Sequence, residues 1–227
     1  MDGRRALILA DRILAANEDR DRQCAKFFAL APPCLVRPGL DSRQTIILMR
    51  FESIADIYAA NQKTREKLLA VLAEVRDDEA DKTTDDEPWS VAYIAEHIAI
   101  VSNGMAGICS KLIEKAKANG AASSDGLAIT DGFYANIAKM ATMKAEAPER
   151  VKPTGSVSIE DSTARLDTAN TVFQSLREGF EQLDLSEPRF PHPYFGDLTA
   201  TEWFALSGLH ERRHTEQIIR LRENLRR

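Results

Sequence analysis

Three histidines occupy positions where a helical protein would ordinarily place leucine or isoleucine. His210 and His214 are four residues apart, so a helix would bring both rings to one face. His97 lies in an earlier segment, on an apolar stripe that includes Ile94 and Val101. An imidazole at a core position loses its hydration, which costs free energy unless its nitrogens find partners. We predict a divalent metal ion shared by all three rings; the alternative is three core imidazoles, each hydrogen-bonded to a neighbour.

The segment from His210 to His214 also matches the His-Glu-x-x-His signature of zinc proteases. Those proteases take their third ligand from downstream, and this chain ends soon after His214. The extended signature requires glycine at position 217 and histidine at position 220, where this chain has Gln217 and Arg220. We therefore expect the third ligand to come from upstream, at His97, and a protease is disfavoured.

A site with three histidine ligands would permit chemistry as well as binding. Tetrahedral zinc has four ligands, so the fourth position stays open to water or a substrate. A bound metal lowers the pKa of a water or a thiol and thereby creates a nucleophile near neutral pH. Zinc and nickel both suit imidazole ligands, so the residues do not distinguish between them.

Neighbouring residues offer candidate supporting groups, each with a simpler structural interpretation. Glu211 would be a base for metal-bound water or, equally, a solvated or supporting group beside His210. His192 lies between two prolines, where a loop-packing role is favoured. Cys109 lies three turns beyond His97, too far along a helix to bind the same metal. The arginines near the C-terminus are expected to form a mostly solvated face.

Four amphipathic segments must position these side chains. Apolar residues recur at steps of three and four, which predicts helices over about residues 53–75, 90–119, 159–183 and 199–227. The sequence from Thr199 to Glu202 is a capping box that begins the last helix. The long connection between the second and third helices contains one short helix near residues 133–145.

These elements predict an all-α protein, a four-helix bundle with one crossover. The short connections make the first and second helices, and the third and fourth, antiparallel pairs. The long crossover between helices 2 and 3 lets those two run in the same direction. No strand pattern longer than a few residues is visible in the sequence.

Two segments resemble motifs of the DinB-like superfamily, which is unrelated to the DNA polymerase of that name. Residues 89–98 resemble its second-helix motif, and residues 191–203 followed by 210–218 resemble its fourth-helix motif. The resemblance covers about residues 50–227. It implies a four-helix bundle of up-up-down-down type, with a metal held by three histidines at the positions of His97, His210 and His214.

The resemblance also implies a set of functions. Members of the superfamily include S-transferases and isomerases that use a low-molecular-weight thiol, and many members have no known activity. We expect a protein that binds zinc or nickel and activates the thiol of a small cofactor for attack on a small-molecule substrate. The alternatives are a non-catalytic stress or metal-binding protein and, less favoured, a metal-dependent hydrolase. A homodimer is left open.

Composition and charge restrict the environment and the partners. The chain is 44% hydrophobic and 29% charged, as in globular proteins. No apolar run approaches the ~20 residues that span a bilayer, so no membrane partner is expected. The net charge is −5 without a basic stripe, which argues against nucleic acid. Three cysteines without a ligand-like cluster favour a reducing, cytoplasmic location.

Residues 1–48 differ from the rest of the chain. They carry eight Lys/Arg and six Asp/Glu, whereas the remainder is strongly acidic. Met49 immediately precedes the regular apolar pattern and would be a plausible natural start. We expect residues 1–48 to be an N-terminal extension, weakly structured or a peripheral helix, and residues 49–227 to form the DinB-like bundle. An ordinary packed N-terminal helix is the alternative.

Overall fold

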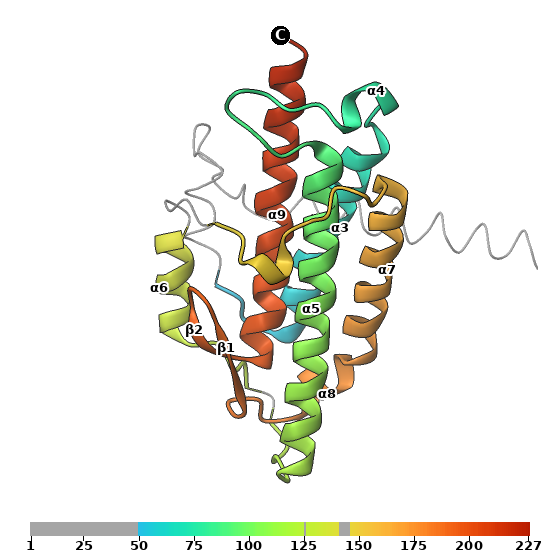
Figure 1. The fold of residues 1–227 in the computed structure, drawn as a ribbon. Coiled ribbons are helices and arrows are strands. Elements are labelled where there is room, and N and C mark those ends of the chain that lie inside the picture. The colour runs from blue at the N-terminus through green and yellow to red at the C-terminus, as the bar shows by residue number, and fades with distance from the viewer. Residues whose placement is uncertain (1–49, 125, 141–145) are drawn as a thin grey trace, which may run out of the picture. The chain divides into compact units, whose positions relative to one another are not determined.

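The structure is a computed structural model that describes residues 50–124, 126–140 and 146–227, all within a unit of residues 42–227. Four long helices of these residues form the bundle (Figure 1). They are α3 (Ile54–Ala73), α5 (Val91–Ala118), α7 (Ile159–Ser175) and α9 (Ala200–Leu225). The expectation for residues 1–48 lies outside the described residues.

Shorter elements connect the long helices. Helix α4 (Asp77–Ala80) precedes α5, and α6 (Asp131–Met140) and the 3₁₀ turn η1 (Glu149–Val151) lie in the crossover. Helix α8 (Arg177–Gln182) follows α7. An antiparallel hairpin of β1 (Arg189–His192) and β2 (Gly196–Thr199) leads into α9.

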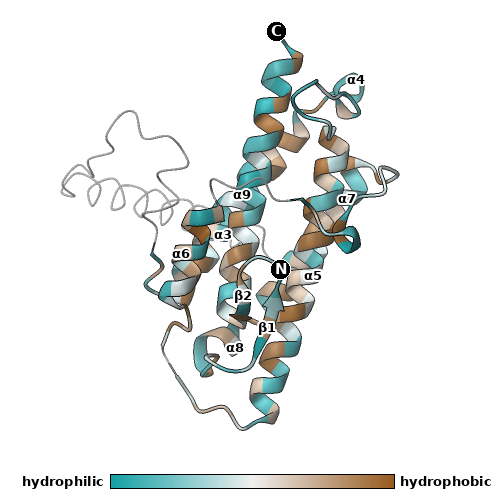
Figure 2. Ribbon diagram, turned by 60° about the vertical axis from the view of Figure 1, so that its left-hand side comes forward, coloured by the Kyte–Doolittle hydropathy of each residue, from teal (hydrophilic) through white to brown (hydrophobic). Residues whose placement is uncertain are grey.

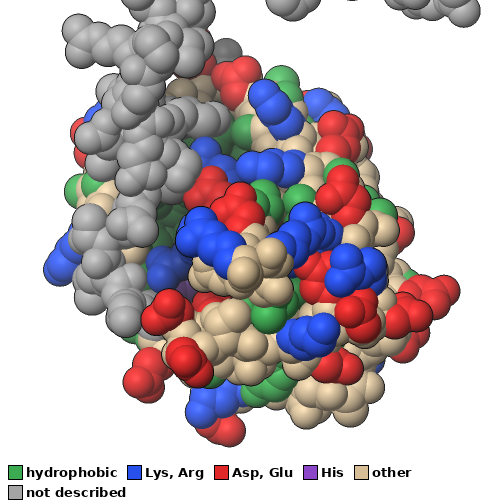
Figure 3. Space-filling view, turned by 90° about the horizontal axis from the view of Figure 1, so that it is seen from above, with side chains coloured by type: hydrophobic (Ala, Val, Ile, Leu, Met, Phe, Trp, Pro, Cys, Tyr) green, Lys and Arg blue, Asp and Glu red, His purple; other side chains and the backbone are tan. Residues whose placement is uncertain are grey.

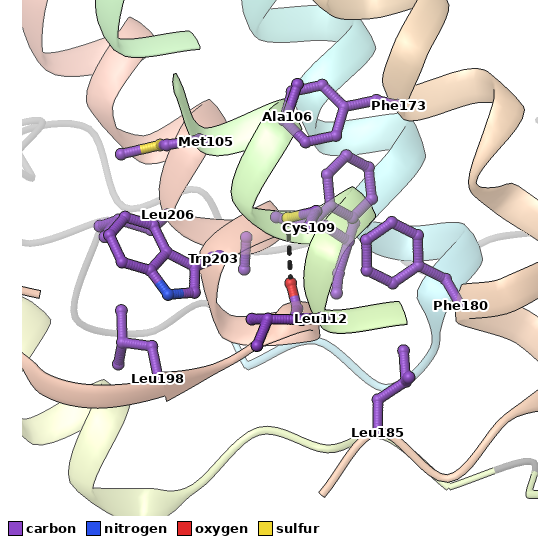
Figure 4. Packing of buried hydrophobic residues seen from close by; sticks show 14 of the residues in the cluster. Met105, Ala106, Cys109, Leu112, Phe173, Phe180, Leu185, Leu198, Trp203 and Leu206 are labelled. Carbon is purple, nitrogen blue, oxygen red and sulfur yellow. Dashed lines mark hydrogen bonds between the residues drawn. The ribbon is translucent and has the colours of Figure 1, made fainter. Parts of the chain in front are cut away.

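Hydrogen bonds between the helices show their directions. In the first half of both α3 and α9, Asn61 donates to the carbonyl oxygen of Phe204 at 3.0 Å. At the other end of both helices, Arg222 donates to the carbonyl oxygen of Glu74 at 2.8 Å. Helices α3 and α9 are therefore parallel. Helix α5 is antiparallel to them, because Cys109 in its second half faces the carbonyl of Ala200, the first residue of α9 (Figure 4).

Helix α7 runs parallel to α5. Glu96 near the start of α5 accepts a hydrogen bond from Gly155, which precedes α7. Ile113 near the end of α5 lies against Gly179 in α8, which follows α7. The four long helices of the described residues thus run up, down, down and up.

The predicted all-α class, the four-helix bundle and the long crossover are confirmed. The helix directions differ from the up-up-down-down order that the resemblance implied. The physical reason is connection length: residues 74–90 and 183–199 are short links, and short links return the chain antiparallel to the preceding helix. The lengths of the connections predicted this arrangement correctly.

The helix boundaries follow from local capping. Ser53 and Thr199 form capping boxes with Asp56 and Glu202, and Ser90 caps α5 through the backbone N–H of Tyr93. The third predicted helix is interrupted at Leu176, between α7 and α8. The hairpin was not predicted, because strands of four residues are too short to show a period of two.

Buried apolar residues of the described chain form two clusters, one toward each end of the bundle. Each long helix is amphipathic and carries both hydrophobic and hydrophilic residues (Figure 2). In α9, Trp203 belongs to the first cluster and Ile218 to the second. Between them lies a buried polar layer of Arg65, Ser102 and Glu211.

Among the described residues, α5 is the one helix long and apolar enough to cross a membrane by length and composition. Its most apolar stretch is 56% buried inside the bundle, against α7 and α9. Core helices of globular proteins share this composition, so the feature does not indicate a membrane span.

Helices α3 and α9 approach each other closely at Gly208. A Cβ atom built on Gly208 would overlap the side-chain amide of Asn61 and lie 3.3 Å from the Asn61 Cα atom. We expect Gly208→Ala to lower the free energy of unfolding by about 1–3 kcal/mol, because Asn61 must move and lose its bond to Phe204. Chemical denaturation measures this effect.

The same substitution at Gly104 is the matched control. Gly104 is also in the interior of a long helix, and a Cβ atom there would meet nothing within 4 Å. Gly104→Ala is expected to stabilise the protein by up to ~1 kcal/mol through helix propensity. Equal effects at the two glycines would contradict the close approach at Gly208.

Candidate metal centre

The structure brings together the three histidines that the sequence singled out. His97 comes from the second turn of α5, and His210 and His214 come from the middle of α9. One ring nitrogen of each lies within 4.8 Å of the others, and the Nε2 atoms of His97 and His210 are 3.2 Å apart. His97 is buried and the other two are half-buried. Their role as metal ligands stays a prediction.

A backbone carbonyl sets the orientation of His97. Its Nδ1 atom lies 2.9 Å from the carbonyl oxygen of Val151 in η1. Because a carbonyl oxygen only accepts, Nδ1 must carry the proton. In a neutral ring, Nε2 then presents a lone pair, and it faces His210. The crossover thus prepares His97 as a ligand through Nε2.

The side-chain amide of Gln217 sets the orientation of His214. Its Nδ1 atom lies 2.6 Å from Oε1 of Gln217, and Nε2 of Gln217 donates to Oε2 of Glu87 at 2.8 Å. The carboxylate of Glu87 can only accept, which places the NH₂ group of Gln217 toward it and the amide oxygen toward His214. His214 therefore donates from Nδ1, and its Nε2 lone pair is available to a ligand.

Burial keeps the cluster in its uncharged form. Burial lowers the pKa of His97, against the hydrogen bond to Val151, which raises it. The pKa of His214 falls to about 3, first because of burial and then because of the charge that His97 would carry. The pKa of His210 lies well below its ordinary value, first because of burial and then because of the charges that His214 and His97 would carry if they were protonated. Neutral imidazole is the form that binds metal.

Loop residues of the described chain contact His97 and the neighbouring Glu96. Glu96, next to His97, accepts hydrogen bonds from the backbone N–H groups of Thr154 and Gly155 at 3.0 and 2.8 Å. Burial alone would raise the pKa of Glu96, but these bonds outweigh it and the pKa is lowered. Trp89 packs edge-on against His97, with ring centroids 5.1 Å apart. Both carboxylate oxygens of Glu96 are thus held by the crossover.

Glu211 is not available as a base for the site. Its carboxylate lies in the polar layer, where it forms an ion pair with Arg65 and accepts a hydrogen bond from Ser102 at 2.9 Å. Arg65 also donates to the carbonyl oxygen of Leu166 at 2.7 Å. Of the alternatives to a base, a solvated role is wrong because Glu211 is buried, and a supporting role in the polar layer agrees with these contacts.

The other candidate residues have structural roles. His192 packs among the rings of Phe195 and Trp203, and burial together with nearby Arg150 lowers its pKa to about 4. Cys109 is buried beside Trp203 in the first cluster, where burial raises the pKa of its thiol (Figure 4). Arg222 is buried against Glu79 and is an exception to the mostly solvated arginine face that was expected. Of the other arginines in this stretch, Arg213, Arg220, Arg226 and Arg227 are exposed.

Sequence reasoning missed Glu87 and the amide role of Gln217. Gln217 lies on the same stripe as His210 and His214, and a polar residue three positions after a candidate ligand was the available signal. Glu87 carries no such signal, because it lies in an acidic segment where the carboxylates are alike in sequence.

The residues present fit a divalent metal. Hydrogen bonds at Nδ1 of His97 and of His214 leave the Nε2 lone pair of each ring free for a metal. The ring of His210 lies against that of His97. In the metal-free protein, Nε2 of His210 can donate its proton to the lone pair on Nε2 of His97, 3.2 Å away, and a bound cation would take the place of that proton. The cluster is compatible with a divalent ion of the zinc or nickel type.

The fold and the cluster define a class of helical bundles with three converging histidines. A sequence model of the DinB superfamily matches residues 60–218, which include all three. The chain belongs to the DinB superfamily, as its two motifs predicted. No curated protein matches the chain significantly. Among solved structures it is similar to TT2238, described as a four-helix bundle protein, with 21% identity, coverage of 72% of this chain and 95% of that one, and a TM-score of 0.48.

Proposed function

We propose that the chain binds one divalent metal ion through His97, His210 and His214 and uses it in thiol transfer to a small electrophile. The observation that carries the metal proposal is the convergence of three neutral imidazoles, two of them with the ligand tautomer set by Val151 and Gln217. When bound, the metal would lower the pKa of a thiol and stabilise its thiolate.

The thiol is proposed to come from a small cofactor. Cys109, the cysteine within the described residues, is buried and its Sγ atom lies 3.5 Å from the carbonyl oxygen of Ala200. Burial raises the pKa of this thiol, which keeps it protonated and unreactive. In the transfer, the sulfur of the external thiolate forms a bond to the electrophilic carbon, and the leaving group departs with its electron pair.

Hydrolysis through metal-bound water is less well supported. A hydrolase needs a base near the water, and the carboxylate of Glu211 is occupied by Arg65 and Ser102. Glu96 is held by Thr154 and Gly155. Both acidic neighbours of the histidines thus have structural partners.

Small-molecule partners in the cytoplasm complete the proposal. At the end of the bundle where α9 terminates, Lys and Arg side chains alternate with Asp and Glu (Figure 3). A mixed face of this kind offers no continuous basic surface for nucleic acid.

The test has two stages, metal content and then transfer. Protein purified after growth with zinc and nickel is expected to contain close to one ion per chain, as measured by elemental analysis. The loaded protein is then assayed for transfer of bacillithiol, mycothiol or glutathione to chlorodinitrobenzene, and we expect metal-dependent product with one of these thiols.

Metal-free protein, prepared with a chelator and reloaded, is the control for the transfer stage. Metal content well below one ion per chain would contradict the whole proposal. Full metal content without transfer by any thiol would favour the non-catalytic metal-binding alternative.

A further inference from the structure

We infer that Glu87, acting through Gln217, is a positioning residue of the metal site that raises the affinity of His214 for the ion. The inference rests on the proposed function, because it concerns the same three histidines. It adds a residue that lies outside the bundle helices, in the connection between α4 and α5.

The hydrogen bonds run in one direction from the ring to the carboxylate. His214 donates to the amide oxygen of Gln217 at 2.6 Å, and the amide nitrogen of Gln217 donates to Glu87 at 2.8 Å. A negative charge at the far end polarises the amide, and the polarised amide oxygen becomes a stronger acceptor for the imidazole N–H. Electron density is thereby shifted toward Nε2 of His214, the ring nitrogen that the bond to Gln217 leaves free for a metal.

Glu87 is itself held in place by the loop that carries it. Its other carboxylate oxygen accepts the backbone N–H of Trp89 at 3.2 Å. Its backbone pairs with Thr84 through two hydrogen bonds of 3.1 Å. Trp89 in turn packs against His97. The same short loop therefore contacts two of the three histidines, one through a ring and one through the Gln217 amide.

A purely structural interpretation of Glu87 makes a different prediction. If the carboxylate only ties the loop to α9, its loss should lower the stability of the metal-free protein and leave metal affinity unchanged. If it acts on His214, its loss should weaken metal binding even when the metal-free protein is equally stable.

The experiment measures zinc affinity by competition with a chromophoric chelator, together with thermal unfolding of the metal-free protein. Gln217→Leu is expected to weaken zinc binding by ~10–100-fold, the usual effect of losing a partner that orients a histidine ligand. Glu87→Gln keeps the shape and removes the charge, and a smaller loss in the same direction is expected.

Two further variants separate charge from shape. The exchange of Gln217→Glu with Glu87→Gln places the carboxylate directly on His214 and the amide behind it, and it is expected to restore zinc affinity at least to the wild-type value. Gln62→Leu is the matched control, because Nε2 of Gln62 donates to Glu66 at 2.9 Å on an exposed face of α3. Zinc affinity should be unchanged in that variant.

The outcomes distinguish this inference from the proposed function. A wild-type protein that binds neither zinc nor nickel overturns the proposed function and the inference with it. A wild-type protein that binds zinc, with unchanged affinity in Gln217→Leu and Glu87→Gln, overturns the inference alone. An exchange variant as weak as Gln217→Leu also overturns it.

Discussion

Alanine in place of His97, His210 or His214 is expected to reduce zinc affinity by more than the ~10–100-fold that loss of an outer hydrogen-bond partner costs. The reason is that each ring supplies one of three converging nitrogens, and two protein ligands do not hold zinc in a catalytic site. Chelator competition measures the loss. The metal-free protein should lose little stability, because removal of a buried imidazole also removes its desolvation cost.

His192→Ala is the matched control for these substitutions. His192 is also a partly buried histidine with a lowered pKa, but its ring lies in the hairpin beside Trp203. Zinc affinity should stay at the wild-type value in this variant. If His210→Ala kept the wild-type zinc affinity, the three histidines would be core imidazoles rather than metal ligands, the alternative that the sequence left open.

The histidine cluster was predictable because it depends on helix geometry. A spacing of four residues places His210 and His214 on one face whatever the rest of the chain does. His97 lies on the apolar stripe of a second helix, and apolar stripes meet in the core of a bundle. The four long helices were predictable for the same reason, because each buries an apolar face and begins at a recognisable cap.

The hydrogen bonds that support the cluster were not predictable, because they depend on where loops lie. The Val151 carbonyl reaches His97 across 54 positions of the chain, and Glu87 reaches Gln217 across 130. Nothing in a loop's composition specifies such a contact. The helix directions, by contrast, follow from connection lengths, and the lengths were more informative than the order implied by the family resemblance.

The buried polar layer was partly visible in the sequence. Arg65 lies on the apolar stripe of α3, and a charge at such a position requires a buried partner. Glu211 is that partner, but the two residues are 146 positions apart in the chain. Because Glu211 lies between His210 and His214 in the sequence, it was a candidate base for the metal site. Its ion pair with Arg65 excludes that role.

The ion pair of Arg65 and Glu211 gives the largest expected effect on stability. Both side chains are less than a tenth exposed. Arg65→Met leaves the carboxylate of Glu211 buried and without its cation, and it also removes the donor to the Leu166 carbonyl. We expect a loss of about 3–5 kcal/mol in the free energy of unfolding of the metal-free protein, measured by denaturant titration.

Two comparisons test the cause of that loss. Lys82→Ala breaks an exposed pair with Asp78, 3.3 Å away, and the substitution should have little effect on the free energy of unfolding. Arg65→Met combined with Glu211→Met removes both buried charges, and the double variant should be more stable than Arg65→Met alone. The double variant is expected to regain stability because the main cost of Arg65→Met is the unpaired carboxylate of Glu211 rather than the lost contact. A double variant less stable than Arg65→Met alone would show that the two helices depend on the pair itself.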